Sequence, residues 1–367
     1  MGKNLKVAVV GCRGIPNVMG GIETHSQNLY PRLYDRGATI KIYARKPYTY
    51  PQRYVFKGVM VAPLRSFTCA GVEAFVHTFT AFLHSFISRP DIVHIHAVGP
   101  AIFAPLFRLT GAKVIFTHHG EDYNRAKWGW FARAILKTGE FLGTKFSHKV
   151  IVISKHIQNL LINNYHAKNT VLIPNGVDIP EKVDSAPYMK KYGLIPKKYF
   201  FACGRLVPEK GFDDLIEAWT LADHGDCKLV IAGSAGEGDE YGTNLKAEAE
   251  AAGVVMTGFI TGDELKSLYQ EAHCFVLPSH HEGLPIVLLE AMSYDLRIIS
   301  SDIPANVEVN LPERCYYKVG DKTLLSQKIA QLAATQSESD YSQIIREQYN
   351  WDKIADQTMA VYNELLK

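Results

Sequence analysis

Short apolar runs alternate with longer amphipathic stretches along the first half of the chain. The runs predict strands at Val7–Val10, Ala38–Ala44, Ile92–His96, Val114–Thr117 and Val150–Ile153. Residues 23–36 are helix-like, and a further helix is expected to open at Ser154. Because strands that are buried on both faces lack polar alternation, this pattern indicates a mostly parallel sheet built from βαβ units.

The same alternation restarts in the second half. Strands are expected at Tyr199–Cys203, Lys228–Ala232, Val254–Met256, Cys274–Leu277 and Arg297–Ser300, separated by helices such as Phe212–Leu221 and Gly262–Glu271. The join is expected in residues 173–178 and the Pro- and Lys-rich stretch that follows to residue 198. The last segment, residues 341–367, is predicted to be helical, with a docking site that the pattern does not reveal.

These patterns predict an α/β protein of two Rossmann-like domains that face each other across a cleft. We place the first domain at residues 1–175 and the second at residues 176–349, and a C-terminal helix at about 350–367 is a candidate to pack back on the first. A chain of 367 residues suits two domains better than one core. Since ligands of such domains bind at the carboxyl ends of parallel strands, the loops after the strands are the places to search for function.

Composition excludes several classes of protein. No apolar run approaches the length that spans a bilayer, and the run Val7–Val10 ends in a Gly-rich loop, as a buried first strand would and a signal peptide would not. The six cysteines, at positions 12, 69, 203, 227, 274 and 315, are scattered without a Cys-x-x-Cys pair. A disulfide framework or structural metal site is therefore not expected, and a reducing cytoplasm fits.

Charge is divided unequally along the chain. Residues 1–175 carry 22 Lys and Arg against 7 Asp and Glu, a net charge of +15, and the remainder carries 18 against 30, a net charge of −12. One explanation is that the first half meets an anionic membrane surface or a phosphorylated acceptor. The other is that opposite charges help the two domains face each other, and the sequence leaves both open.

Two carboxylates flank a Gly-Leu-Pro turn in the second half. Glu282 precedes Gly283, Leu284 and Pro285, and Glu290 follows within an apolar run. Pro285 suits the first position of a helix, so the amides of Gly283 and Leu284 are expected at a helix start, where the macrodipole favours an anion. The segment offers donors for a phosphate between two acceptors for hydroxyls, which is what a nucleotide sugar requires.

A basic loop follows the first strand of the second half. Arg205 and Lys210 lie among Gly204 and Gly211, and two cations beside glycines suit a diphosphate, with Arg as a bidentate fork and Lys as a mobile charge. The alternative is a solvated loop with Glu209 as a local counter-charge. Its position after a strand favours phosphate binding.

Two loops of the first half complete the set. Residues 11–21 lack the Gly-x-Gly-x-x-Gly spacing of dinucleotide sites, although Gly20 and Gly21 before a helix allow close approach to a phosphate or sugar.

His118 and His119 end a strand beside Gly120, Glu121 and Asp122, which favours contact with a reacting group over a structural role. His94 and His96 lie within a strand and are interpreted as structural. A metal is conceivable for such a set of side chains, but the spacing matches no compact metal motif.

Together these segments resemble family 4 of the retaining, nucleotide-sugar-dependent glycosyltransferases, which have the GT-B fold. The matching segments follow the order of the family over nearly the whole chain: Gly20–Glu23, Thr117–Asp122, Pro174–Asp178, Gly204–Arg205, Glu209–Gly211 and Glu282–Glu290. The opening Gly11–Pro16 is similar to bacterial polysaccharide-assembly members, including rhamnosyl- and hexosyltransferases that contribute to lipopolysaccharide.

The resemblance implies a role for each matching residue of the second half. Arg205 and Lys210 would hold the diphosphate and stabilise the leaving nucleoside diphosphate. Glu290 would bind the ribose hydroxyls, and Glu282 would face hydroxyls of the donor sugar. The amides of Gly283 and Leu284 would hold sugar or phosphate oxygens. His280 and His281, which precede Glu282, are placed to influence the choice of donor.

In the first half the resemblance assigns His119 to the active site near the donor sugar, so that the implied catalytic set is His119, Glu282, Arg205 and Lys210. Gly20 and Gly21 would shape the loop that meets phosphate and acceptor. Glu23 and Asp122 would contact the acceptor. His118 and Glu121 differ from the commoner family residues, which leaves acceptor contacts there open.

The implied reaction is retaining and needs neither cofactor nor metal beyond the donor substrate. The acceptor hydroxyl attacks the face from which the diphosphate leaves, through an oxocarbenium-like transition state, while fixed cations and helix-terminus amides stabilise the developing charge. No carboxylate pair marks a double displacement, so Glu282 is not assigned as a nucleophile.

A segment of basic and aromatic residues suggests where such an enzyme works. Residues 124–149 interleave Arg125, Lys127, Arg133, Lys137, Lys145 and Lys149 with Trp128, Trp130, Phe131, Phe141 and Phe146, and residues 72–87 are also rich in aromatics. Such interleaving suits an interfacial helix on anionic lipid, although each aromatic could equally be core. We therefore expect a cytoplasmic protein on the inner face of the membrane, with a lipid-linked or glycan acceptor and no nucleic-acid partner.

Two other functions remain open at this stage. One is a non-catalytic protein that binds sugar nucleotides or glycans on the same fold, and the other is a nucleotide-sugar epimerase of GT-B-like architecture. Substrate binding without turnover would favour the former, and isomerisation of a sugar without an acceptor would favour the latter. A nicotinamide oxidoreductase is disfavoured because the dinucleotide fingerprint is missing.

Overall fold

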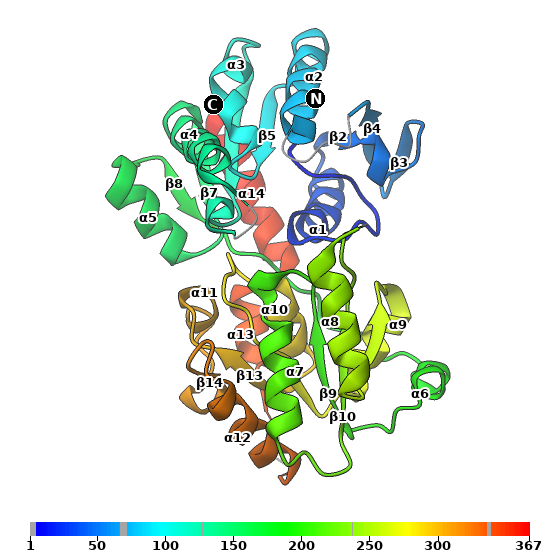
Figure 1. Cartoon of the computed structure of the whole chain (residues 1–367). Helices are drawn as coiled ribbons and strands as arrows, with labels where there is room; N and C mark the ends of the chain where they lie inside the picture. Colours follow the sequence, from blue (N-terminus) through cyan, green and yellow to red (C-terminus); the bar gives the residue numbers. More distant parts are fainter. Residues whose placement is uncertain (1–4, 67–71, 126–127, 237, 336–338) are drawn as a thin grey trace. The chain divides into compact units, whose positions relative to one another are not determined.

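The computed structural model describes residues 5–66, 72–125, 128–236, 238–335 and 339–367, so that Cys69 and Lys127 lie outside the described residues. The chain divides into two compact units (Figure 1). The first unit combines Met1–Gly176 with Trp351–Lys367, and the second is Val177–Asn350. Each is a parallel-sheet α/β unit, as the apolar runs predicted.

The first unit is built on an eight-stranded sheet of order β3-β4-β2-β1-β5-β6-β7-β8. Neighbouring strands are parallel except for β3, which runs antiparallel to β4. The strands are β1 (Lys6–Val10), β2 (Thr39–Arg45), β3 (Tyr54–Phe56), β4 (Val59–Leu64), β5 (Ile92–His96), β6 (Lys113–His118), β7 (Lys149–Val152) and β8 (Thr170–Leu172). The five predicted strands are confirmed to within one residue at each end, whereas β3, β4 and β8 were not expected.

Six helices and three short 3-10 turns accompany this sheet in the described part of the first unit. They are α1 (Gly21–Asp35), α2 (Val72–Ser88), α3 (Ala104–Arg108), α4 (Trp130–Phe146), α5 (Lys155–Tyr165), α14 (Trp351–Leu366), η1 (Lys46–Tyr48), η2 (Pro100–Phe103) and η3 (Asp122–Asn124). Ser154 caps α5 by accepting a hydrogen bond from the backbone N–H of Ile157, which confirms the expected helix start.

The core of the first unit joins both ends of the chain. Its apolar residues come from β1, β2 and α1, and Trp351, Ile354 and Tyr362 of α14 belong to the same cluster. The helix α14 packs along α1, as Figure 1 also shows. Burial of a full apolar face is what holds a terminal helix in place, because an isolated helix of this length is marginal in water.

The second unit is built on a six-stranded parallel sheet of order β11-β10-β9-β12-β13-β14. Its strands are β9 (Tyr199–Cys203), β10 (Lys228–Ala232), β11 (Val255–Gly258), β12 (Cys274–Leu277), β13 (Arg297–Ser301) and β14 (Tyr316–Tyr317). Three of the five predicted strands have the expected bounds, and the short edge strand β14 was not expected. The core packs α7 and α12 against this sheet.

The helices described in the second unit are α6 (Ala186–Tyr192), α7 (Phe212–Leu221), α8 (Glu240–Ala251), α9 (Gly262–Glu271), α10 (Ile286–Ser293), α11 (Pro304–Val307), α12 (Lys322–Ala333) and α13 (Ser342–Gln348), with turns η4 (Pro208–Lys210) and η5 (Glu313–Cys315). The helical prediction for residues 341–367 is confirmed, and the structure divides this segment into two helices, α13 and α14. The backbone between them pairs with Val177, whose N–H donates to the Tyr349 carbonyl at 2.7 Å.

Among the described residues, no helix combines the length and the apolarity that crossing a bilayer requires.

Candidate functional site

Two loops of the second unit meet because the strands that precede them are neighbours. β9 pairs with β12, so residues 204–211 and 278–285 leave the same edge of the sheet. Gly211 has a φ of +63°, and a Cβ at this position would lie 2.4 Å from the Pro278 carbonyl oxygen. The backbone N–H of His280 donates to the Glu209 carbonyl at 2.9 Å. The two loops are therefore locked together, and Gly211 permits their close approach.

An ion pair connects the two predicted motifs. The Lys210 ammonium lies 2.5 Å from Glu282 Oε1, and Ser279 donates its hydroxyl to the same oxygen at 2.7 Å. Both charged side chains are mostly buried, with 15% and 10% of their surfaces exposed. An ammonium has three N–H donors and a carboxylate has two oxygens, so this pair keeps donors and an acceptor for a ligand.

Charged groups of the candidate site influence the pKa of Cys203, at the end of β9. Burial raises the pKa of its thiol to about 12, and the Glu290 carboxylate raises it further while the Lys210 ammonium opposes the shift. Cys203 is the last residue of β9, so Arg205 and Lys210 follow it in the same loop. Arg205 follows two residues later and is partly buried. The structure thus gathers the predicted donor-side residues around the carboxyl end of one strand.

Glu290 lies on α10 and accepts a hydrogen bond from the Tyr269 hydroxyl at 2.9 Å. Removal from water raises the pKa of its carboxyl to about 7, and the hydrogen bond from Tyr269 opposes that shift. Glu290 therefore changes charge in the physiological range, which an exposed glutamate does not do.

The helix after the Gly-Leu-Pro turn begins one residue later than predicted. Pro285 is the N-cap of α10, and Ile286 is its first helical residue. The extended conformation of Pro285, with φ −74° and ψ 110°, places its ring outside the helical ladder. Gly283 and Leu284 form the bend before the cap, and Leu284 is buried. The expectation that Pro285 occupies the first helical position is corrected accordingly.

In the first unit, the loop after β1 closes on the start of α1. Gly20 is the N-cap of α1 with a φ of +150°, and Gly21 is its first residue. Glu23 is buried and accepts the backbone N–H of Arg13 at 2.9 Å. A Cβ on Gly20 would lie 2.1 Å from Glu23 Oε2. Glu23 therefore fastens the loop to the helix, and its predicted contact with an acceptor stays a prediction.

The two adjacent histidines after β6 have different environments. His118 is fully buried, accepts the N–H of Gly120 on Nδ1 at 3.2 Å and donates from Nε2 to Glu140 at 2.7 Å. Asp122 forms an ion pair of 2.6 Å with Arg125 on the turn that follows. His118 is consequently a structural residue, and His119 is the partly buried ring beyond the strand.

A chain of hydrogen bonds runs from His119 into the core. His119 Nε2 lies 2.8 Å from His96 Nδ1, and His96 Nε2 contacts the Tyr30 hydroxyl. His94 Nδ1 in turn meets the hydroxyls of Tyr362 at 2.6 Å and of Tyr30 at 3.1 Å. Burial lowers the pKa of His119 and of His96 well below the usual range, and neighbouring imidazoles lower them further. The histidines are thus neutral, and each makes directional hydrogen bonds.

His25 completes this cluster. It stands 4.9 Å from the His119 ring, and its Nδ1 is 3.0 Å from Asn175 Oδ1. The ring nitrogens of His25, His96 and His119 lie within 4.8 Å of one another, which makes them a candidate cation site in the described part of the chain. Two nitrogens on one tetrahedral zinc would be roughly 3.3 Å apart. The 2.8 Å between His96 and His119 is instead the length of a hydrogen bond.

Sequence reasoning missed the residues behind His119. The pattern indicated a structural role for His96, and it pointed to no role for His25, Tyr30 or Tyr362. Asn175 lies in the matching segment Pro174–Asp178, to which no role was assigned. The one signal for the residues behind His119 was the His-x-His pattern of β5, since residues two apart on a strand share a face. Nothing local in the sequence connects Tyr362 with that face.

The comparisons with known proteins cover most of the chain. Residues 19–181 match the family described as Glycosyltransferase Family 4, and residues 185–351 match the family described as Glycosyl transferases group 1. An uncharacterised glycosyltransferase of Methanocaldococcus jannaschii is 25% identical over 98% of both chains. An O-antigen biosynthesis glycosyltransferase of Escherichia coli is 23% identical over 82% of this chain and 87% of its own. The Anabaena protein HepE, solved with UDP-glucose, superimposes with a TM-score of 0.78 at 17% identity over 98% of this chain and 100% of its own.

Proposed function

Because the chain belongs to glycosyltransferase family 4 and has its GT-B fold, we propose that it moves a hexose or deoxyhexose from a nucleoside-diphosphate sugar to a lipid-linked or polysaccharide acceptor in cell-surface glycan synthesis. The O-antigen enzyme of Escherichia coli supports the pathway class, and the UDP-glucose of HepE supports the donor class. In this proposal the second unit binds the donor and the first unit binds the acceptor.

The observation that carries the proposal is the ion pair between Lys210 and Glu282, 2.5 Å apart at the end of the β9 and β12 loops. Departure of a nucleoside diphosphate creates negative charge, and a cation held in place by a carboxylate stabilises that charge without reorganisation. Lys210 can keep one N–H on Glu282 and direct the others to phosphate oxygens. Glu282 keeps one oxygen for a sugar hydroxyl.

Arg205 and Glu290 bind two further parts of the donor, the diphosphate and the ribose. The guanidinium of Arg205 is suited to grip two phosphate oxygens at once. The ionised Glu290 carboxylate accepts the two ribose hydroxyls, and its position on α10 keeps it apart from the reacting bond. The amides of Gly283 and Leu284 serve the sugar or a phosphate oxygen before the helix start.

The proposed chemistry is retaining and uses no metal. The acceptor hydroxyl attacks the anomeric carbon on the face that the diphosphate leaves, as the bond between that carbon and the phosphate oxygen breaks. The hydroxyl proton passes to the departing phosphate, whose negative charge also balances the oxocarbenium-like sugar. His119 is neutral at physiological pH, because burial lowers the pKa of its ring, and so it acts as a hydrogen-bond partner of the sugar rather than as a fixed cation. Gly20 and Gly21 shape the loop that meets the donor phosphate beside the acceptor, and Glu23 and Asp122 contact the acceptor.

We place the enzyme peripherally on an anionic membrane, where lipid-linked acceptors are found. Trp130 and Phe131 begin α4 and are 82% and 63% exposed, and Arg133 and Lys137 lie exposed further along the same helix. Aromatic rings beside basic residues suit the interface between head groups and acyl chains. Residues 1–175, which include this segment, carry a net charge of +15, so the surrounding region also favours an anionic surface.

The test is release of nucleoside diphosphate from a panel of sugar nucleotides, with and without lipid-linked acceptors, followed by NMR of the anomeric configuration of the product. Replacing Lys210 by Met should lower kcat roughly 100- to 1,000-fold, and Glu290→Ala should weaken donor binding roughly 10- to 100-fold. Glu264→Gln, a surface carboxylate of the same unit, should match the wild type. The proposal fails if no donor is turned over with any acceptor, if the sugar is isomerised without one, or if the product is inverted.

A further inference from the structure

The helix α2 is amphipathic in the opposite sense to an ordinary surface helix. It buries Glu73, His77, Thr78, Ala81 and Ser85, and it exposes a stripe of apolar side chains, namely Val72, Phe75, Phe79, Leu83, Phe86 and Ile87. Phe86 is 55% exposed and Ile87 is 81% exposed. A soluble surface seldom presents so many large apolar side chains on one helix, so this stripe indicates a surface that is covered in the working protein.

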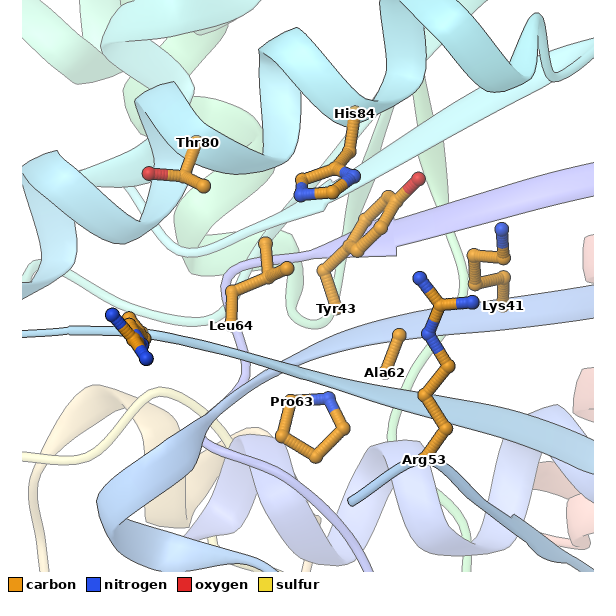
Figure 2. Close-up of a pocket in the computed structure, with 9 residues that line it drawn as sticks. Lys41, Tyr43, Arg53, Ala62, Pro63, Leu64, Thr80 and His84 are labelled. Carbon is orange, nitrogen blue, oxygen red and sulfur yellow. The ribbon is translucent and has the colours of Figure 1, made fainter. Parts of the chain in front are cut away.

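A basic cavity opens beside this helix. Its volume is about 350 Å³, and it lies between α2 and the strands β2 and β4. Figure 2 shows Thr80 and His84 reaching it from the helix, with Lys41 and Arg53 on the side of the sheet. Arg65 also lines it and borders a second cavity of about 450 Å³ that adds Lys46. Among the described residues, neither cavity has a carboxylate in its lining.

The cations of this cavity lack counter-charges in the part of the chain that the structure describes. Lys41, Arg53 and Arg65 form no ion pair there, and the nearby Glu73 is engaged by Arg45 at 3.6 Å. Burial lowers the pKa of the Lys41 ammonium, and the Arg53 guanidinium lowers it further. Like charges that disfavour one another in this way are relieved by an anion between them.

We propose that this cavity binds the phosphate of an anionic phospholipid head group while the apolar stripe of α2 lies in the membrane interface. The guanidinium of Arg53 or Arg65 grips phosphate oxygens in a bidentate manner, and Lys41 adds a point charge. Thr80 and His84 are one turn apart on the edge of the helix next to the stripe, so a head group that reaches them leaves its acyl chains on the apolar side.

A membrane is the occupant that matches both features at once. An apolar protein partner would cover the stripe but would leave the cations unpaired, and a soluble phosphate would fill the cavity but would leave the stripe in water. The surrounding unit is strongly basic, which attracts the whole enzyme to anionic lipid before the cavity engages. This inference rests on the proposed function in one respect, because a lipid-linked acceptor requires an enzyme that works at a membrane.

The cavity is separate from the residues assigned to the reaction. It lies at the β3–β4–β2 edge of the sheet, and His119 follows β6, with β1 and β5 between the two. Vesicle binding therefore needs neither donor nor turnover. Loss of vesicle binding in a cavity variant would leave the transferase proposal standing, and loss of transferase activity in a Lys210 variant would leave the lipid proposal standing.

The experiment measures co-sedimentation of the whole protein with vesicles of phosphatidylcholine alone or with phosphatidylglycerol. The wild type should bind only the anionic vesicles. The double variant Arg53→Gln/Arg65→Gln should bind them at least tenfold more weakly, since each basic residue at such a surface contributes about fivefold. Lys155→Gln/Lys168→Gln removes equal charge beside α5, at the other edge of the sheet, and should stay within about twofold of the wild type.

Two further double variants test the nature of the ligand. The first distinguishes a specific phosphate site from general charge attraction, and the second distinguishes a membrane lipid from a soluble phosphate. Arg53→Lys/Arg65→Lys keeps the charge but removes the fork and should bind several-fold more weakly. Phe86→Ser/Ile87→Ser should also weaken vesicle binding, whereas Ile162→Ser/Ile195→Ser, which changes two exposed isoleucines away from the stripe, should not. Thermal melting checks that each variant is folded.

The proposal is overturned if the wild type ignores anionic vesicles, if the Lys variants bind as the wild type does, or if the two Gln pairs lose binding equally. It is also overturned if glycerol phosphate in solution binds the wild type as tightly as the vesicles do while Phe86→Ser/Ile87→Ser keeps full vesicle binding. That last result would identify a soluble phosphate as the ligand.

Discussion

At the scale of single residues, the neighbours of His119 decide which of its ring nitrogens carries the hydrogen. A neutral imidazole has one N–H, and its location is set by the partner of each nitrogen. The Tyr362 hydroxyl is 2.6 Å from His94 Nδ1, closer than the Tyr30 hydroxyl at 3.1 Å, and we assign it as the donor. Tyr30 then donates to His96 Nε2, and His96 donates from Nδ1 to His119 Nε2. His119 keeps its hydrogen on Nδ1.

Replacing Tyr362 by Phe should reverse the direction of donation along this series of hydrogen bonds. His94 then takes its hydrogen bond from Tyr30, the ring of His96 turns its N–H toward Tyr30, and His119 moves its hydrogen to Nε2. Nitrogen-15 shifts of the imidazoles report the change directly, and the lost buried hydrogen bond should lower the free energy of unfolding by about 1–2 kcal/mol.

The matched control is Thr358→Val on the same helix. Thr358 is buried, and its hydroxyl donates to the Ile354 carbonyl of its own helix at 2.8 Å. It should lower stability without moving the His119 shifts. Unchanged His119 shifts in Tyr362→Phe would refute the assigned chain.

Glu290 gives a prediction of pH dependence. Burial raises the pKa of its carboxyl to about 7, so the group is largely protonated at pH 6 and ionised at pH 8. Only the ionised form accepts hydrogen bonds on both oxygens from ribose hydroxyls. The affinity for a nucleoside-diphosphate sugar, whose two phosphates stay ionised throughout this range, should therefore rise with pH through 7, and calorimetry between pH 5.5 and 8.5 measures it.

The Glu290→Gln variant should bind more weakly with a flat profile over this range. Glu264→Gln should keep the slope of the wild type, because its ion pair with Lys191 lowers the pKa of Glu264 and removes it from this window. A slope that survives in Glu290→Gln would assign the titration to another group.

At the scale of elements, the backbone at the start of α1 requires a glycine at position 20 but not at position 21. Gly20 adopts a φ of +150° and leaves no room for a Cβ beside Glu23. Gly21 has ordinary helical geometry, and a Cβ there would meet nothing within 4 Å. Two adjacent glycines thus have unequal roles, which the sequence alone presents as equivalent.

Gly20→Ala should consequently lower the free energy of unfolding by about 1–3 kcal/mol, because it combines an unfavourable backbone conformation with a steric conflict at Glu23. Gly21→Ala should be neutral or stabilise the protein by up to about 1 kcal/mol, since it restricts the unfolded chain. Denaturant titration of both variants checks the contrast, and equal effects would contradict the described loop.

At the scale of the whole molecule, the chain returns to the unit in which it began. Val177–Asn350 form the second unit, and Trp351–Lys367 rejoin the first. A Cβ on Gly176 would lie 2.6 Å from the Trp351 ring, so the two points at which the chain changes units are packed against each other. The stability of the first unit therefore depends on its last residues.

Trp351→Ala should destabilise the first unit by about 3–5 kcal/mol, as expected for a large buried aromatic side chain. Leu366→Ala, at an exposed position of the same helix, should change stability by less than about 0.5 kcal/mol. Hydrogen exchange should show faster opening of β1, β2 and α1 with β9 and β10 unchanged. Uniform acceleration over both units would contradict the division.

Several features could be predicted from the sequence because their causes are local. The strands β5, β9, β10 and β12 have the expected bounds because an apolar run between breakers has few other ways to be buried. The positions of Lys210 and Glu282 after two strands followed from the same pattern. Their places in the loops needed only the order of residues and the rule that parallel strands present their carboxyl ends at one edge.

Other features were decided only by the tertiary structure. The 2.5 Å pair of Lys210 and Glu282 needed the strand order β9-β12. The link from His119 through His96 to Tyr362 needed the docking of α14. The outward direction of the apolar stripe of α2 was set when the polar side of that helix was buried. Residue types and periodicity act over a few positions, whereas these contacts join residues far apart in the chain. The geometry of these contacts is set only when the folded sheets bring the ends of particular strands together.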